Sequence, residues 1–233
     1  MPTQLLPSFT SATHGFPFPN SWEPGTPVLE VPTPLGTIRL GDASGGVCGG
    51  MVYAAADFYL FNRPVPQDRS KRLFQHFCRR LLDSWSLPFG VMKYFHWQCR
   101  PGHTNSWFGT RLVSGVTRLT AVEEWPRIRQ AIDSGLPAPL GLVKVESWRI
   151  QDMPQNHQVL CFGYDAADDG SATTLHCYDP NWPGQDVRLS LDLSAPDEER
   201  LVAHSVEGTT VRGVFLTDYV RPLELNLGEP GQS

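Results

Sequence analysis

Charged residues are scarce in this chain: they make up 18% of its 233 residues, against 40% hydrophobic residues. So low a charge content argues against a disordered or coiled-coil protein, and the apolar fraction is large enough to build a core. The net charge of −5 gives no basic excess, so we expect no nucleic-acid partner. The length fits one domain better than two independent ones.

Long apolar runs are also lacking, since none approaches the ~20 residues of a membrane span. The opening residues Met1–Leu6 have neither a basic segment nor a long apolar stretch, so we expect no secretory signal. The five cysteines are odd in number and irregularly spaced, which argues against a disulfide framework. We therefore expect reduced thiols and a cytoplasmic location.

Composition and periodicity divide the chain into successive parts of a single domain, residues 1–233. Residues 1–40 are rich in Pro, Ser, Thr and Gly, which predicts an irregular N-terminal arm with a short strand at Gly36–Leu40. Residues 41–135 are predicted to form a mainly helical half. Residues 136–222 are predicted to form an antiparallel β-sheet half, and residues 223–233 a tail. This order predicts an α+β fold, with a cleft between the halves as a site.

Three segments of the first half have helical patterns. Cys48–Leu60 is apolar on nearly all sides, which is typical of a buried central helix. Asp68–Trp85 has apolar residues four apart with basic residues between them, which predicts a surface helix. Thr120 followed by Glu123 predicts a capping box that opens a helix ending near Gly135.

The second half changes to strand patterns. The predicted strands are Leu140–Glu146, His157–Asp165, Thr173–Asp179, Asp186–Leu193 and Val211–Val220. Residues 86–119 show no clear period of either kind.

Cys48 stands between glycines at the predicted start of the central helix. The free N–H groups and the dipole of a helix start lower the pKa of a thiol there and favour the thiolate. Small neighbours leave room for a substrate carbonyl, and the Cys48 N–H can face a developing oxyanion. Gly49 and Gly50 are poor helix formers, so helix propensity does not explain them. The alternative is a buried structural cysteine at a tight turn.

A thiolate nucleophile needs a base, and the base needs an orienting partner. His157 opens one predicted strand, and the next ends at Asp179-Pro180-Asn181. A hairpin centred near residue 169 sets His157 opposite Asn181, with Asp179 as the diagonal neighbour on the same face. Either Asp179 or Asn181 can orient the ring. The structural alternatives are a strand-end histidine bonded to the backbone and a turn-forming aspartate.

Three motifs therefore follow one another along the chain. They are Gly46-Val47-Cys48-Gly49-Gly50, a histidine-led strand ending Gly163-Tyr164-Asp165, and the strand end Tyr178-Asp179-Pro180. This order resembles that of the papain-like cysteine peptidase superfamily, and within it most closely the bacteriocin-leader-processing peptidases. The resemblance implies a papain-like fold, with a helical half that carries a Cys-headed central helix and an antiparallel β-sheet half.

The resemblance also implies roles for residues and a reaction. Cys48 would be the nucleophile, His157 the base and Asp179 the orienting group, with Asn181 in reserve. The implied activity is that of a cysteine-dependent hydrolase or acyl transferase, of peptidase or amidase type, which acts through a thioester on a peptide or amide substrate. No cofactor and no metal are implied.

One position departs from the family pattern. Papain-like enzymes usually carry a glutamine six residues before the cysteine as an oxyanion donor, and here that position is Asp42, an acceptor. Asn20 in the arm is the candidate replacement. The departure favours the alternative function, a catalytically silent papain-like domain that binds peptides.

His96, Cys99 and His103 have spacings of three and four, which suggests a metal site as a further hypothesis. Zinc needs four ligands, or three and a water, and no matching second cluster lies nearby in the sequence. We therefore expect structural roles for these three residues.

Overall fold

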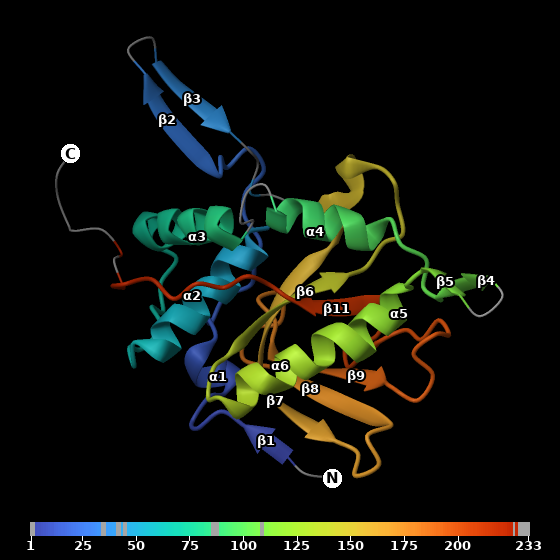
Figure 1. Cartoon of the computed structure of the whole chain (residues 1–233). Helices are drawn as coiled ribbons and strands as arrows, with labels where there is room; N and C mark the ends of the chain where they lie inside the picture. The colour runs from blue at the N-terminus through green and yellow to red at the C-terminus, as the bar shows by residue number, and fades with distance from the viewer. Residues whose placement is uncertain are drawn as a thin grey trace.

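A curled antiparallel sheet with helices packed against it forms the body of the molecule (Figure 1). The computed structural model describes residues 3–33, 36–40, 43, 46–84, 89–107, 110–225 and 227. Over these residues the sheet has seven strands in the order β10-β9-β8-β7-β6-β11, and β1 pairs with β7. Six α-helices accompany it in the same ranges. The predicted α+β class is confirmed.

The strands of the main sheet include all five predicted for the second half. Their bounds are β1 Thr3–Leu5, β6 Ala138–Val143, β7 His157–Ala166, β8 Ala172–Tyr178, β9 Asp186–Asp192, β10 Ala203–His204 and β11 Gly213–Leu216. Two hairpins lie apart from it: β2 Leu29–Thr33 with β3 Gly36–Leu40, and β4 Asn105–Trp107 with β5 Thr110–Val113. The predicted strand at Gly36–Leu40 is therefore confirmed, and its hairpin projects from the body (Figure 1).

The central helix α2 spans Cys48–Leu60, as predicted, and is buried along almost its whole length. The predicted surface helix is α3, Lys71–Ser84, and the predicted end Trp85 lies outside the described residues. The other helices are α1 Ser11–His14, α4 Phe89–Gln98, α5 Val116–Arg118, the π-helical turn η2 Leu119–Glu124, α6 Trp125–Asp133 and the 3-10 turn η3 Ile150–Gln155. Within these ranges no helix is both long enough and apolar enough to cross a membrane.

The predicted capping box at Thr120 is wrong. Helix begins at Val116 and continues through Thr120, whose hydroxyl instead donates to Val214 O at 3.2 Å and accepts from Val214 N at 3.0 Å. The hydroxyl therefore joins the helix to β11. In the sequence, a threonine that bonds a distant strand cannot be distinguished from one that caps a helix. The end near Gly135 is confirmed, because Gly135 follows α6 with φ of +78°.

The N-terminal segment, for which the sequence predicts mainly irregular structure, is part of the core. β1 pairs with Gly163–Asp165 of β7, and the rings of Phe9, Phe16 and Phe18 are buried. The segment then reaches the end of β8, where Asn20 N donates to Pro180 O at 2.9 Å. The scattered aromatic residues of this Pro-rich segment hold it against the core.

The register between β7 and β8 places the proposed site residues together at the ends of these two inner strands. Leu160 pairs with Tyr178 and Cys161 with Cys177, which is the predicted register. A bulge at Phe162 shifts the pairing by one residue farther along. The predicted alignment therefore holds at the end of the hairpin where β7 begins and β8 ends.

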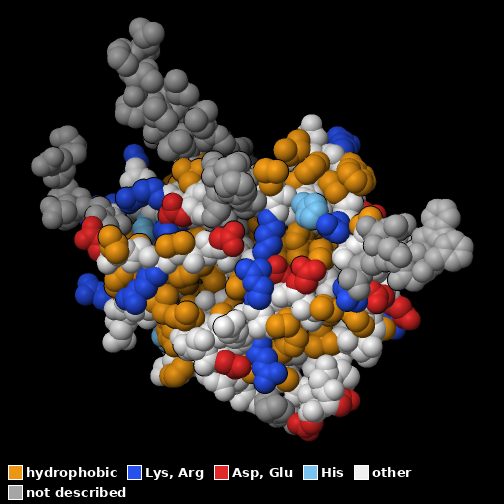
Figure 2. Space-filling view, in the orientation of Figure 1, with side chains coloured by type: hydrophobic (Ala, Val, Ile, Leu, Met, Phe, Trp, Pro, Cys, Tyr) orange, Lys and Arg blue, Asp and Glu red, His pale blue; other side chains and the backbone are white. Residues whose placement is uncertain are grey.

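The surface mixes charges of both signs. Figure 2 shows Lys and Arg side chains interspersed with Asp and Glu over one face, with hydrophobic side chains between them. This pattern agrees with the small net charge of the chain.

α2 and α3 approach so closely at Gly50 that a side chain would not fit: a Cβ there would overlap the main-chain oxygen of Phe77. Helix propensity alone predicts that Gly50→Ala stabilises the protein by about 1 kcal/mol. We expect the opposite, a loss of about 1–3 kcal/mol from overpacking, measured by denaturant unfolding. Stabilisation would show that the two helices are not in contact at this point.

Candidate active site

His157 and Asp179 form a buried hydrogen-bonded pair where β7 begins and β8 ends. His157 Nε2 donates to Asp179 Oδ1 at 2.7 Å, and Asp179 is 2% exposed. β7 begins at His157, and Asp179 follows the last residue of β8. The antiparallel pairing of the two strands therefore brings together residues that lie 22 positions apart.

Asn181 lies beside this pair and makes a longer contact with the His157 ring than Asp179 does. Its side-chain nitrogen lies 3.4 Å from His157 Nε2, and the residue is exposed. Its main-chain N–H donates to Asp179 Oδ1 at 2.8 Å and so helps to hold the carboxylate. Of the two candidates that the sequence left open, Asp179 makes the short, buried bond to the ring.

Cys48 begins α2 on the other side of the imidazole and is partly exposed. Its sulfur interacts with the His157 ring through charge and a hydrogen bond, and it accepts a hydrogen bond from the main-chain N–H of Gln158. Because Nε2 of His157 is engaged by Asp179, Nδ1 is the ring nitrogen left for the sulfur. Thiol, imidazole and carboxylate thus stand in one chain of interactions.

The electrostatics of this chain favour an ion pair. Burial alone would raise the pKa of the Cys48 thiol, but the charge of His157 and the hydrogen bonds from His157 and Gln158 bring it below its ordinary value. Burial alone would lower the pKa of His157, but the charges of Asp179 and Cys48 and their hydrogen bonds raise it to about 10. A thiolate facing an imidazolium follows from both shifts.

Three of the other cysteines have the opposite electrostatics. Burial raises the pKa of Cys78 to about 11 and also raises the pKa of Cys99 and Cys177. Cys161 and Cys177 pair across β7 and β8 in the core. These thiols are buried, so they serve as internal references for the reactivity of Cys48.

Asn20 connects the N-terminal segment to both sides of the site. Its Oδ1 accepts from Val47 N at 2.6 Å and from Trp22 Nε1 at 3.3 Å, which fixes the orientation of the amide. Its Nδ2 faces Asn181 Oδ1 at 3.4 Å. A donor nitrogen therefore lies beside the residues that precede Cys48.

Gly46 makes this approach possible. A Cβ there would overlap Asn20 Nδ2, and the φ of +92° is one that favours glycine. Asp42, at the position where papain-like enzymes usually carry a glutamine, lies outside the described residues. Asn20 is the side-chain amide that the described structure brings to the segment before Cys48.

Two residues that the sequence analysis did not single out adjoin the pair. Tyr94 of α4 donates its hydroxyl to His157 O at 3.3 Å and so supports the start of β7. His204 of β10 lies with Nε2 3.9 Å from Asp179 Oδ2. Neither stands in a recognisable motif, because each reaches the site only through the folding of a distant segment.

Two of the three residues considered as a metal site, His96 and Cys99, have separate partners. His96 Nε2 lies 2.6 Å from Arg100 Nη2, and Cys99 Sγ donates to Ser147 O at 3.3 Å. A search of the described residues finds no group of three His, Cys, Asp or Glu side chains placed to hold a metal ion.

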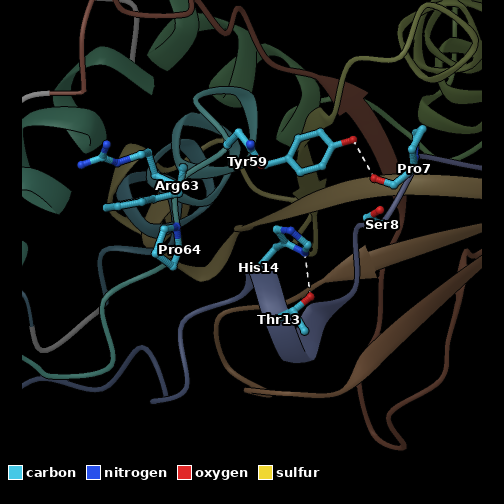
Figure 3. Close-up of a pocket in the computed structure, with 9 residues that line it drawn as sticks. Pro7, Ser8, Thr13, His14, Tyr59, Arg63 and Pro64 are labelled. Atoms are coloured by element: carbon cyan, nitrogen blue, oxygen red, sulfur yellow. Dashed lines mark hydrogen bonds between the residues drawn. The ribbon is translucent and has the colours of Figure 1, made fainter.

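A cavity of about 500 Å³ lies at the opposite end of α2 from Cys48 (Figure 3). It is lined by α1 and by the chain that follows α2. The polar groups in it bond to the protein itself: the His14 ring pairs with Thr13 Oγ1 at 2.7 Å, and the Tyr59 hydroxyl donates to Pro7 O at 3.1 Å. Figure 3 shows the His14 ring next to the Tyr59 ring, and the two are in edge contact with centroids 5.4 Å apart.

No family model, no curated protein and no solved structure matches this chain. The case for a function therefore depends on the geometry described above.

The ion pair predicts selective alkylation. At about pH 6 a thiol of ordinary pKa is less than about 1% ionised, so Cys48 should react with iodoacetamide well ahead of the other four cysteines. In His157→Ala only the hydrogen bond from the Gln158 N–H still opposes the effect of burial on the thiol, and labelling of Cys48 at this pH should fall by about 100-fold. Peptide mass mapping of the labelled protein measures both rates.

A matched pair of variants tests the orienting residue. Asp179→Asn removes the negative charge that raises the pKa of His157, so less of the thiolate–imidazolium pair forms. Labelling should therefore fall most at about pH 6, where only that pair supplies thiolate. Asn181→Ala removes only the weaker contact and should change labelling by less than about 3-fold. Five equally slow thiols in the unaltered protein would contradict the ion pair.

Proposed function

We propose that this protein is a cysteine-dependent hydrolase or acyl transferase that acts on a peptide or amide through a thioester. The observation that carries the proposal is the chain of interactions from Cys48 through His157 to the buried Asp179. A nucleophile, a base and an orienting carboxylate in hydrogen-bonded sequence are what acyl transfer requires. A thiol at the head of a buried helix, opposed to a histidine that leads a sheet strand, also supports a papain-like arrangement.

The reaction follows from the protonation states. The Cys48 thiolate attacks the substrate carbonyl carbon and forms a tetrahedral oxyanion. His157, protonated at Nδ1, gives that proton to the leaving amine as the carbon–nitrogen bond breaks, which leaves a thioester on Cys48. His157 then accepts a proton from the water or amine that attacks the thioester, and the thiolate is released. Asp179 keeps the ring oriented and stabilises its charged form.

The oxyanion needs donors that are already in place. The main-chain N–H of Cys48 belongs to the first turn of α2, where N–H groups have no partner within the helix. Asn20 Nδ2 is the second donor in our proposal, because Oδ1 is held by Val47 and Trp22 and the nitrogen lies between Gly46 and Asn181 Oδ1.

Acylation of Cys48 by p-nitrophenyl acetate tests the proposal without knowledge of the natural substrate. We expect a burst of p-nitrophenol equal to the enzyme concentration, with the acetyl group on Cys48 by mass spectrometry. Cys48→Ser and His157→Ala should each reduce the burst rate by at least about 100-fold, as the loss of a triad member does.

Acetylation spread evenly over lysines and buried thiols, with no dependence on His157, would overturn the proposal. That outcome would favour the alternative, a catalytically silent domain that uses the same region to bind peptides.

The oxyanion role of Asn20 can be separated from thiolate formation. Iodoacetamide alkylation displaces iodide and forms no oxyanion, whereas acylation does. Asn20→Ala should therefore slow acylation by about 100-fold, as the loss of one oxyanion donor does, while alkylation at about pH 6 changes little. Stopped-flow acylation and timed alkylation of the same preparation give the two rates.

Asn20→Asp keeps an oxygen for Val47 N–H and Trp22 Nε1 but removes the donor, so acylation should stay slow even if the fold is fully retained. Equal losses in both reactions for Asn20→Ala, with recovery in Asn20→Asp, would instead show that Asn20 only supports the loop.

A further inference from the structure

Asp179 has a second oxygen that the triad does not use. Oδ1 accepts from His157 Nε2 at 2.7 Å and from Asn181 N at 2.8 Å. Oδ2 faces Nε2 of His204, at 3.9 Å. Both side chains are shielded from solvent: 2% of the Asp179 side chain and 1% of the His204 side chain is exposed. A buried carboxylate is stable only where donors face both of its oxygens.

His204 has a defined tautomer. Its Nδ1 accepts a hydrogen bond from Val206 N at 3.0 Å, so the proton of the neutral ring lies on Nε2, which is the nitrogen facing Asp179. Burial lowers the pKa of His204 below its ordinary value; the charge of Asp179 and the backbone hydrogen bond with Val206 oppose this shift, and the charges of His157 and Lys144 add to it. The ring is therefore neutral, with its N–H facing Asp179 Oδ2 at 3.9 Å, beyond hydrogen-bond distance, and it is not a second cation that would compete with His157.

The position of His204 in the fold explains why its side chain lies next to Asp179. β10 contains only Ala203 and His204 and pairs with β9, which in turn pairs with β8 ahead of Asp179. The chain leaves β10 at once and bonds back to the ring through Val206. A short edge strand thus ends in a side chain that reaches over to the carboxylate.

We propose that His204 is a positioning residue for the reaction, which extends the chain to Cys48–His157–Asp179–His204. This inference rests on the proposed function. The N–H dipole of His204 fixes the rotation of the Asp179 carboxylate and stabilises its charge, so that Oδ1 stays directed at His157. His204 touches neither the substrate nor the sulfur.

Two substitutions separate this role from a structural one. In His204→Gln the side-chain amide nitrogen reaches roughly the place of Nε2, so the donor to Asp179 is kept and the bond to Val206 is lost. In His204→Asn the side-chain oxygen takes roughly the place of Nδ1, so the bond to Val206 is kept and the donor is lost. A positioning role and a loop-holding role therefore predict opposite orders of activity.

The readout is the pH profile of Cys48 alkylation by iodoacetamide, with p-nitrophenyl acetate acylation beside it. We expect His204→Asn to slow both reactions by about 5- to 10-fold at about pH 6, with the acid limb of the profile moved to higher pH. His204→Gln should stay within about 3-fold of the unaltered protein. Thermal unfolding of both variants establishes that each is folded.

Unchanged profiles in His204→Asn, or a loss in His204→Gln alone, would overturn the positioning role while leaving the Cys48–His157–Asp179 chemistry intact. Absence of His157-dependent labelling in the unaltered protein would overturn the proposed function and this inference together.

Discussion

The hydrogen bond from His157 to Asp179 is the interaction on which the site depends. A carboxylate with 2% of its surface exposed would be costly without partners, and His157 and the main-chain N–H of Asn181 both donate to its Oδ1. The carboxylate in turn sets which nitrogen of the imidazole faces Cys48 and raises the pKa of the ring. The lowered pKa of the thiol follows from that charge, so three separate segments share one electrostatic arrangement.

The parts of the site that the sequence predicted are those governed by local pattern. α2 could be bounded at Cys48 because glycines precede and follow the cysteine and an apolar run follows. The register of β7 and β8 could be predicted because one short polar loop joins two regular strands. Choosing Asp179 over Asn181 could not be done in this way, since both lie within reach of His157 in that register. The structure distinguishes them by contact alone: Asp179 bonds the ring at 2.7 Å in a buried position, whereas the Asn181 side chain lies 3.4 Å away.

The rest of the site depends on contacts between segments that lie far apart in the chain. Thr120 shows the same limit in the fold: its hydroxyl bonds β11, and no local pattern distinguishes that bond from a helix cap. Asn20 and His204 each reach the site from a short or irregular segment, where neither period nor motif marks them. The role of a polar side chain in such a segment can be assigned only when the tertiary structure shows its hydrogen-bond partners.

Through Asn20, the packing of the N-terminal segment is connected to the geometry of the site. Its main chain bonds the residue after Asp179, and its side chain bonds the residue before Cys48. The segment therefore spans the two ends of the interaction chain and fixes the helix start relative to the strand end. Because β1 and the buried rings of Phe9 and Phe16 hold the same segment against the sheet, core packing and the alignment of Cys48, His157 and Asp179 are properties of one structural unit.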